Sequence, residues 1–396
     1  LGMVVVIPCF NEPDLVGSLE ALRACARPDC AVEVITVVNA GVQHPAHIHE
    51  RNALTLAHAR EWAATHNEAT LQFHFLEFPA LPKKHAGVGL ARKIGMDEAV
   101  HRLALVDRHE APIVCFDADA GCRPNYLRAI ETHFRELPKT PACSIFYAHP
   151  LEGPEVPDVY AAITRYELYL RYYVLALRQA GHPHAFHTIG SSMAVRSAAY
   201  QAQGGMNRRK AGEDFHFLQK LIPLGHFSEL KTTAVLPSPR ISDRVPFGTG
   251  KAIGDWVADP KLDYPVYALR SFQLLGEFIS ALDAMLATDT RDFAALLEHA
   301  PKEVAAYLNH IDFAENIRQI ASNTTNAAMF RKRFFRWFNG LKVLQYFHFV
   351  RDEFLANVPV AEASAALLEW MGEAVPTSDS DLHKALLECF REIEQR

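Results

Sequence analysis

The chain has 396 residues, more than one compact core usually carries, so we expect two domains. Hydrophobic residues make up 49% and charged residues 22% of it, which excludes a disordered or collagen-like chain. The 40 basic and 46 acidic residues give a net charge of −6, which offers no electrostatic footprint for nucleic acid.

Apolar segments alternate with helical ones over the first third of the chain. The predicted strands cover residues 3–7, 32–38, 71–78 and 111–116, and helical spacing separates them. This alternation predicts an α/β fold with a doubly wound, mostly parallel sheet. Such sheets bind ligands beyond the carboxyl ends of their strands, so the segments "PCFNE", "NAG" and "DADAGC" are expected to meet at one edge.

The pattern changes after the fourth strand. We predict strands at 142–149 and 187–196, with an aromatic-rich helix at 157–180 between them. The proline- and glycine-rich loop at 236–251 is long for a simple connection, which indicates a lid or a domain boundary. The chain is helical from about residue 260. We therefore predict one domain over 1–255 and a helical C-terminal domain over 256–396.

The hydrophobic segment "IVCFDADAGC" leads directly into Asp117 and Asp119. Two carboxylates this close repel each other unless a cation or a shared proton holds them. A calcium EF-hand is excluded, because its sixth position holds Cys122 and its twelfth holds Arg128. Three interpretations stay open: a phosphatase of the haloacid-dehalogenase type, a metal site of a nucleotide-sugar transferase, and a solvated strand end.

Three further motifs accompany "FDADAGC". They are "VVVIPCFNE" in the first strand, "GVGLARKIG" before the fourth strand and "GEDFHFLQKL" further on. In this order and rough spacing, residues 3–250 resemble glycosyltransferase family 2. The resemblance implies a GT-A fold over 1–255 and a hexosyltransferase-type enzyme that uses a nucleotide sugar.

The resemblance also implies roles for single residues. Asp214 matches the family's catalytic base, with Glu213 beside it. Asp117 and Asp119 match the ligands of Mn²⁺ or Mg²⁺, a hard cation that carboxylate and diphosphate oxygens suit. The residues that match the nucleotide-binding positions are Pro8, Phe10, Glu12, Asn39, Arg92 and Asp117. Asn39 stands where the family usually has an acid, so the base of the donor stays open.

Three more residues are candidates for contacts with the acceptor or with the diphosphate. His187 precedes the segment where this family meets its acceptor. Arg240 and Arg244 lie in the loop 236–251, where they either neutralise the leaving diphosphate or are simply exposed. The resemblance implies transfer with inversion to an unidentified acceptor hydroxyl, and we expect a UDP- or GDP-sugar as the donor. We expect non-processive transfer, because "RFFRW" has Arg333 where the Q-x-x-R-W motif of processive synthases has glutamine.

Two other functions are compatible with the same sheet and with a bound nucleotide. One is a nucleotidyltransferase, although such an enzyme more naturally has a glycine-rich, basic loop after its first strand. The other is a non-catalytic protein that binds a nucleotide sugar, which the departure at Asn39 keeps open.

The cysteines and the apolar runs indicate the cellular compartment and whether a membrane is involved. The seven cysteines include no C-x-x-C pair, and their odd number does not suit a disulfide framework, so we expect reduced thiols and a cytoplasmic protein. No uncharged apolar run reaches the roughly 18 residues of a transmembrane helix. The basic, aromatic stretch 330–350 leaves a peripheral membrane contact open, but a buried helical core interrupted at Asn339 is the better interpretation.

Overall fold

The computed structural model describes residues 1–242, 248–260, 264–288, 290–377 and 381–396. Its backbone contacts divide the chain into two compact units. The first unit contains residues 1–160, 188–255 and 395, and the second contains residues 161–187, 256–394 and 396. Residues 161–187, which we placed in the domain 1–255, thus group with the helical residues that follow 255.

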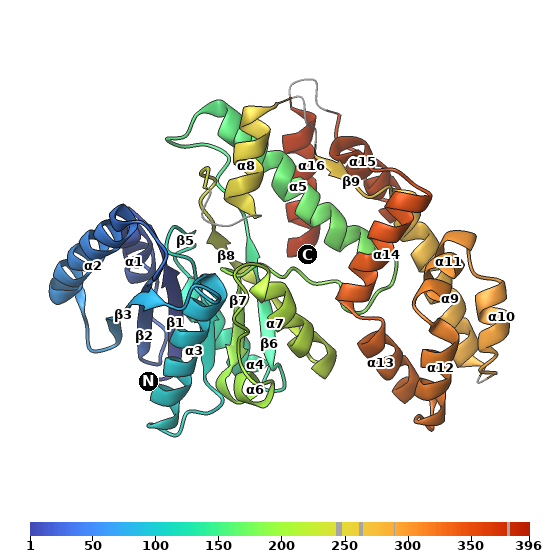
Figure 1. The fold of residues 1–396 in the computed structure, drawn as a ribbon, viewed down its shortest axis with the longest axis horizontal. Coiled ribbons are helices and arrows are strands. Elements are labelled where there is room, and N and C mark those ends of the chain that lie inside the picture. The colour runs from blue at the N-terminus through green and yellow to red at the C-terminus, as the bar shows by residue number, and fades with distance from the viewer. Residues whose placement is uncertain (243–247, 261–263, 289, 378–380) are drawn as a thin grey trace. The chain divides into compact units, whose positions relative to one another are not determined.

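An eight-stranded sheet forms the centre of the first unit (Figure 1). Its strands are β1 (Met3–Cys9), β2 (Val32–Gly41), β3 (Leu71–Leu81), β4 (Pro112–Cys115), β5 (Gly121–Cys122), β6 (Ala142–Tyr147), β7 (Met193–Arg196) and β8 (Ser228–Leu236). Their order across the sheet is β3-β2-β1-β4-β7-β6-β8-β5. The order places β4, which leads into Asp117, beside β1, which leads into Glu12.

The sheet is mostly parallel. Neighbours are parallel from β3 through β2 and β1 to β4, and again between β6 and β8. Strand β7 is antiparallel to both β4 and β6, and β5 is antiparallel to β8. The predicted α/β class is therefore confirmed, and the carboxyl ends of β1, β2 and β4 lie at one edge.

Helices pack against this sheet. They are α1 (Leu15–Arg23), α2 (Ala46–His66), α3 (Val88–Ala104), α4 (Tyr126–Glu136), α6 (Ser197–Ala202) and α7 (Glu213–Leu221), followed by a 3₁₀ turn at Ile222–Leu224. Helix α3 packs against β1 and β2, where Gly95 lies directly on Val6 and Val37. The absence of a side chain at residue 95 lets the helix backbone approach the sheet closely.

Several strand ends differ from the predicted ones. Strand β2 continues through Asn39 to Gly41, and β3 passes Pro79 to end at Leu81, because the two extensions pair with each other. Local turn signals were overridden by this pairing. Strand β7 is shorter than the predicted strand 187–196 and begins at Met193, because Ser192 donates its backbone N–H to Ile189 O in a turn (3.0 Å).

The second unit is helical. Its elements are most of α5 (Pro157–Gln179), the end of α8 (Thr249–Ala258), α9 (Leu269–Ala287), α10 (Phe293–Glu298), α11 (Lys302–His310), α12 (Phe313–Ser322), α13 (Ala327–Trp337), α14 (Gly340–Glu353), α15 (Val360–Met371), α16 (Leu382–Gln395) and the antiparallel pair β9 (Pro265–Val266) and β10 (Val358–Pro359). The predicted helical C-terminal region is confirmed. No helix of the described residues is long and apolar enough to span a membrane.

The basic, aromatic stretch 330–350 forms the core of this unit. Phe330, Phe334 and Phe338 are fully buried. Helix α13 ends at Trp337, and Asn339 caps α14 by accepting the backbone N–H of Leu341 (3.1 Å). The interpretation as a buried core interrupted at Asn339 is confirmed.

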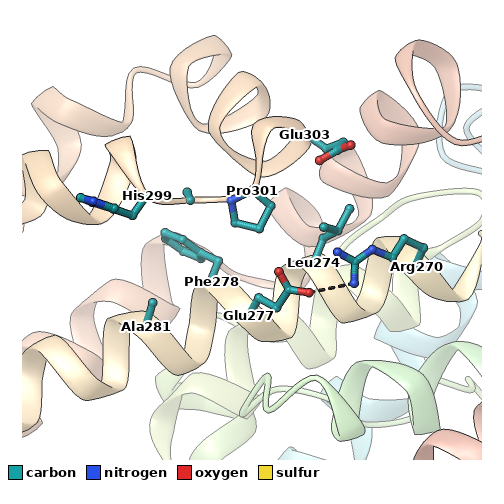
Figure 2. A pocket seen from close by; sticks show the side chains of 9 residues that line it. Arg270, Leu274, Glu277, Phe278, Ala281, His299, Pro301 and Glu303 are labelled. Carbon is teal, nitrogen blue, oxygen red and sulfur yellow. Dashed lines mark hydrogen bonds and ion pairs between the residues drawn. The ribbon is translucent and has the colours of Figure 1, made fainter.

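A pocket of about 350 Å³ also belongs to the second unit (Figure 2). Helix α9 contributes Arg270, Glu277 and Phe278, and the segment from His299 to Glu303 forms the opposite wall. Arg270 and Glu277 form an ion pair of 2.8 Å. None of the residues with a predicted role lines this pocket.

Candidate active site

The two aspartates follow a buried strand. All four residues of β4 are buried, and Phe116 continues the pairing by donating its N–H to Val6 O (3.0 Å). The chain then turns, with the Ala120 N–H donated to Asp117 O (3.2 Å). Asp117 and Asp119 therefore lie at the carboxyl edge of the sheet, with 40% and 23% of their side chains exposed.

Arg92 connects this edge to the start of α7. Its guanidinium donates to Asp117 Oδ1 (2.8 Å) and to Glu213 Oε1, and the side chain is only 2% exposed. Burial lowers the pKa of Arg92, but Glu213 and Asp117 more than offset this and hold it above its ordinary value. The observed side chain is a buried brace between the two acidic motifs, and its role near base and diphosphate stays a prediction.

Glu213 and Asp214 open helix α7. Gly212 precedes them in a left-handed conformation (φ 66°), which glycine adopts without strain. Glu213 is buried in its ion pair with Arg92, whereas Asp214 is half-buried. Asp214 is therefore the more exposed of the two acids.

The titration of this pair reflects its burial. Burial raises the pKa of Glu213 to about 7, with Arg92 opposing the shift and the charge of Asp214 adding to it. Burial also raises the pKa of Asp214, against the effects of Arg92 and of the N–H groups of Phe215 and Gly190. Two carboxyls this close titrate as a pair and not independently.

Arg240 binds two carboxylates, those of Glu12 and Asp119. Its Nη1 donates to Glu12 Oε1 (2.9 Å), and its Nη2 donates to Glu12 Oε2 and to Asp119 Oδ2 (2.7 Å to Asp119). Glu12 is fully buried, whereas Arg240 is 24% exposed. Arg240 thus lies on the two carboxylates at the ends of β1 and β4. Arg244 lies outside the described residues.

The ends of β1 and β2 form the remaining wall. The ring of Phe10 lies 4.7 Å from that of His44, centroid to centroid. Asn39 is 3% exposed, and its Oδ1 has no hydrogen-bond partner among the described residues, while its backbone carbonyl accepts from Asn52 Nδ2 (2.9 Å). A buried acceptor without a partner is costly, so the site fits a ligand that donates a hydrogen bond. Pro8 is half-buried at the same edge.

The charges at this edge do not balance. Among the described residues it contains five carboxylates (Glu12, Asp117, Asp119, Glu213 and Asp214) and two guanidiniums (Arg92 and Arg240). The raised pKa of Glu213 and Asp214 reduces the excess negative charge without removing it. An anionic diphosphate would bind poorly here unless a further cation accompanied it.

The donor set fits a hard divalent cation only in part. Within the described ranges, no three His, Cys, Asp or Glu side chains are arranged to hold a metal. Asp117 and Asp119 supply carboxylate oxygens of the right type, and Mg²⁺ typically takes one or two carboxylates with phosphate oxygens completing its shell. The residues therefore fit a cation that binds together with a diphosphate.

His187, the candidate acceptor contact, keeps that role as a prediction. It lies in the second unit, where its Nε2 is 2.7 Å from Glu394 Oε1. Sequence reasoning missed Gly190, which packs against the Arg92 guanidinium and presents its N–H to Asp214. The glycine in "HTIGSSM" was the available signal. It also missed Asn52, which positions Asn39 from α2.

A side chain at residue 190 should disturb Arg92. In Gly190→Ala the added Cβ would lie 2.6 Å from Nη1 and 3.0 Å from Nη2 of the buried guanidinium. We expect a loss of about 1–3 kcal/mol in the free energy of unfolding, typical of an overpacked core. The control is Gly121→Ala, where the nearest atom would lie 3.7 Å away. Urea unfolding measures both, and equal losses would contradict the contact.

Comparison with known proteins gives no family assignment. No protein-family model matches the chain, and no curated protein matches it. Among solved structures, S. aureus TarS residues 1–349 in complex with UDP-GlcNAc is similar at 13% identity and a TM-score of 0.41, covering 99% of this chain and 92% of that one. Its complex with UDP has a TM-score of 0.38 at the same identity and coverage. A likeness this distant carries no inference about what this chain binds.

Proposed function

We propose that this protein transfers a sugar from a nucleoside-diphosphate sugar to an acceptor hydroxyl. The observation that carries the proposal is the brace at Arg92, which binds both Asp117 and Glu213, although Glu213 lies 121 residues from Arg92 in sequence. It brings a pair of carboxylates suited to a diphosphate-bound cation next to a carboxylate suited to act as a base. The resemblance to glycosyltransferase family 2 assigns these same two motifs to donor and base.

The donor would lie along the carboxyl edge of β1, β2 and β4. The nucleoside would lie against Phe10 and Pro8, with its base donating a hydrogen bond to the buried Oδ1 of Asn39. Asp117 and Asp119 would hold Mn²⁺ or Mg²⁺, which supplies Lewis-acid neutralisation of the departing diphosphate when bound. Arg240, now on Glu12 and Asp119, would release Asp119 and offer its guanidinium to the diphosphate, an anion that it can bind in a bidentate manner.

Asp214 would act as the general base. It is the more exposed of the two acids, and the N–H groups of Phe215 and Gly190 fix its carboxylate. Its place at the first turn of α7 favours the anion through the helix dipole. The carboxylate would take the proton of the acceptor hydroxyl as the hydroxyl oxygen attacks the anomeric carbon, which leads to inversion in a single displacement.

A thermal-shift panel tests the donor class. UDP, GDP, CDP, dTDP and ADP would each be added with and without Mn²⁺. A ligand at 100 times its dissociation constant adds about 2.7 kcal/mol of stability, and we expect one nucleotide to give this only with the metal. No shift with any nucleotide would contradict the proposal. A metal-dependent shift without turnover would favour a non-catalytic nucleotide-sugar-binding protein instead.

Removing the charge of Asp119 should abolish the dependence of nucleotide binding on the metal. In Asp119→Asn the side chain keeps its shape but loses the negative charge that a hard cation requires, so Mn²⁺ should no longer strengthen nucleotide binding. Calorimetric titration of the nucleotide with and without Mn²⁺ measures this. The control is Asp29→Asn, an exposed residue in a loose ion pair with Arg135 (3.7 Å), which should keep the full metal dependence. Unchanged metal dependence in Asp119→Asn would rule out Asp119 as a ligand.

A further inference from the structure

Two cysteines from distant parts of the sequence meet beside residues 117–120, the acidic loop that contains Asp117 and Asp119. Cys25 follows the end of α1, and Cys122 ends the short strand β5. Their sulfurs lie 3.5 Å apart, although 97 residues separate them in sequence, and both are free thiols. The backbone is braced at the same place, because Ala26 donates its N–H to Pro124 O (2.7 Å). The two thiols are therefore held together by the fold.

The surroundings of Cys25 lower its pKa, although burial opposes the shift. The hydrogen bond from Cys122 is the main cause that lowers the pKa of Cys25, and the N–H groups of Leu127 and Tyr126 and the charge of Arg27 add to it. Those two N–H groups belong to the first turn of α4, a position that stabilises a thiolate. The pKa of Cys122 is raised by the same hydrogen bond and by burial. Of the two thiols, Cys25 is therefore the one with the lowered pKa.

Three other thiols differ from Cys25 in the direction of their pKa shift. Burial raises the pKa of Cys115, Cys143 and Cys30 to about 12. Thiols of such high pKa react slowly, because the thiolate is the nucleophile. Cys122 is partly exposed, which gives a small oxidant access to the pair, whereas Cys25 is buried.

We propose that Cys25 and Cys122 form a dithiol oxidation site that closes to a disulfide on reaction with a peroxide or a low-molecular-weight disulfide. With hydrogen peroxide, the Cys25 thiolate attacks one oxygen and releases hydroxide, leaving a sulfenic acid. The Cys122 sulfur then attacks the Cys25 sulfur and forms the disulfide bond. The oxygen of the sulfenic acid leaves as water, which takes up the thiol proton of Cys122. Two thiols are oxidised by two electrons, and one peroxide is reduced to two waters. The sulfurs need to approach by roughly 1.5 Å to reach the length of a disulfide bond.

The disulfide would act on the acidic loop. Cys122 lies three residues after Asp119, and β5 pairs with the end of β8, which leads to the Asp119 partner Arg240. Closing the bond would move β5 toward α1 and displace Asp119 from its present position. We therefore expect oxidation to weaken metal-dependent nucleotide binding, an effect that rests on the proposed function, whereas formation of the bond does not.

Thiol counting on the full chain tests the bond itself. The reduced protein is treated with hydrogen peroxide in stoichiometric steps, unfolded, alkylated and weighed by mass spectrometry. We expect the number of alkylated thiols to fall from seven to five, with a Cys25–Cys122 crosslinked peptide in the digest and recovery of all seven after dithiothreitol. Retention of seven thiols, or a crosslink between other cysteines, would overturn the proposal.

Matched variants test whether the lost thiols are those of Cys25 and Cys122. Cys25→Ser should keep all six of its thiols at the same peroxide dose, and Cys30→Ser should lose two of its six. Cys122→Ser should form no crosslink and lose at most one thiol, that of Cys25 as its sulfenic acid. Should a serine variant not fold by circular dichroism, the alanine variant replaces it, and the crosslinked peptide of the wild type still decides. Nucleotide affinity with Mn²⁺ is then measured on the oxidised wild type. An unchanged affinity would overturn the link to Asp119 while the crosslink establishes the oxidation site.

Discussion

Asp214→Asn should lower turnover by roughly 10²–10⁴-fold, the usual contribution of a general base. The amide keeps the shape of the side chain and can still accept the N–H of Phe215, but it cannot take a proton from a sugar hydroxyl. Nucleotide and metal affinity should hardly change, because those contacts are made by residues at the ends of β1, β2 and β4. Turnover is measured as nucleoside diphosphate released from the donor that the thermal-shift panel identifies.

The pH profile provides a second readout of the same base. The pKa of Glu213 is raised to about 7 and that of Asp214 is also raised, so the pair becomes fully ionised only near or above neutral pH. A base acts in its unprotonated form, so the rate of the wild type should rise with pH as Asp214 ionises, above the usual range of an aspartate, and then level off. The residual activity of Asp214→Asn should lack this rise. Near-normal turnover of the variant would exclude Asp214 and leave Glu213 as the candidate.

Arg92→Leu should cost about 3–5 kcal/mol of unfolding free energy, the usual effect of removing one partner from a buried ion pair. Both side chains of the Arg92–Glu213 pair are at most 4% exposed, so Glu213 would remain in the interior without its cation. The control lies one residue further along α3, where Lys93 pairs with Asp97 at 2.9 Å on the surface. Lys93→Leu should cost about 1 kcal/mol or less, because exposed pairs contribute little. Urea unfolding compares the two.

The cost at Arg92 should also depend on pH. The raised pKa of Glu213 means that the folded chain keeps this proton up to about pH 7, whereas the unfolded chain releases it near pH 4.5. Stability therefore falls as pH rises between these two values. Without Arg92 the folded-state pKa of Glu213 would rise further, so the loss in Arg92→Leu should deepen above pH 7. A loss independent of pH would mean that Glu213 is not the group left uncompensated.

Local sequence patterns alone predicted the first four strands of the sheet, whereas β5 and β8 were not predicted. Runs rich in apolar and β-branched residues identified β1, β2, β3 and β4, and the uninterrupted run of β1 is typical of a strand buried on both faces. The break at Asn339 between α13 and α14 was also readable, because the asparagine side chain caps a helix through neighbouring backbone N–H groups. The order of the motifs along the chain indicated which strand ends carry acidic groups, but not which cations they meet.

The tertiary structure decided the partners and the strand ends. The contacts of Arg92 with Glu213, of Arg240 with Glu12 and of Cys25 with Cys122 join residues 121, 228 and 97 positions apart. Such contacts depend on how strands and helices pack, and local periodicity has no information about packing between distant segments. The extension of β2 through Asn39 has the same origin, since pairing with β3 outweighed the local turn signal. The sequence thus determined which charged groups reach the edge of the sheet, and packing decided which of them are buried, paired and shifted in pKa.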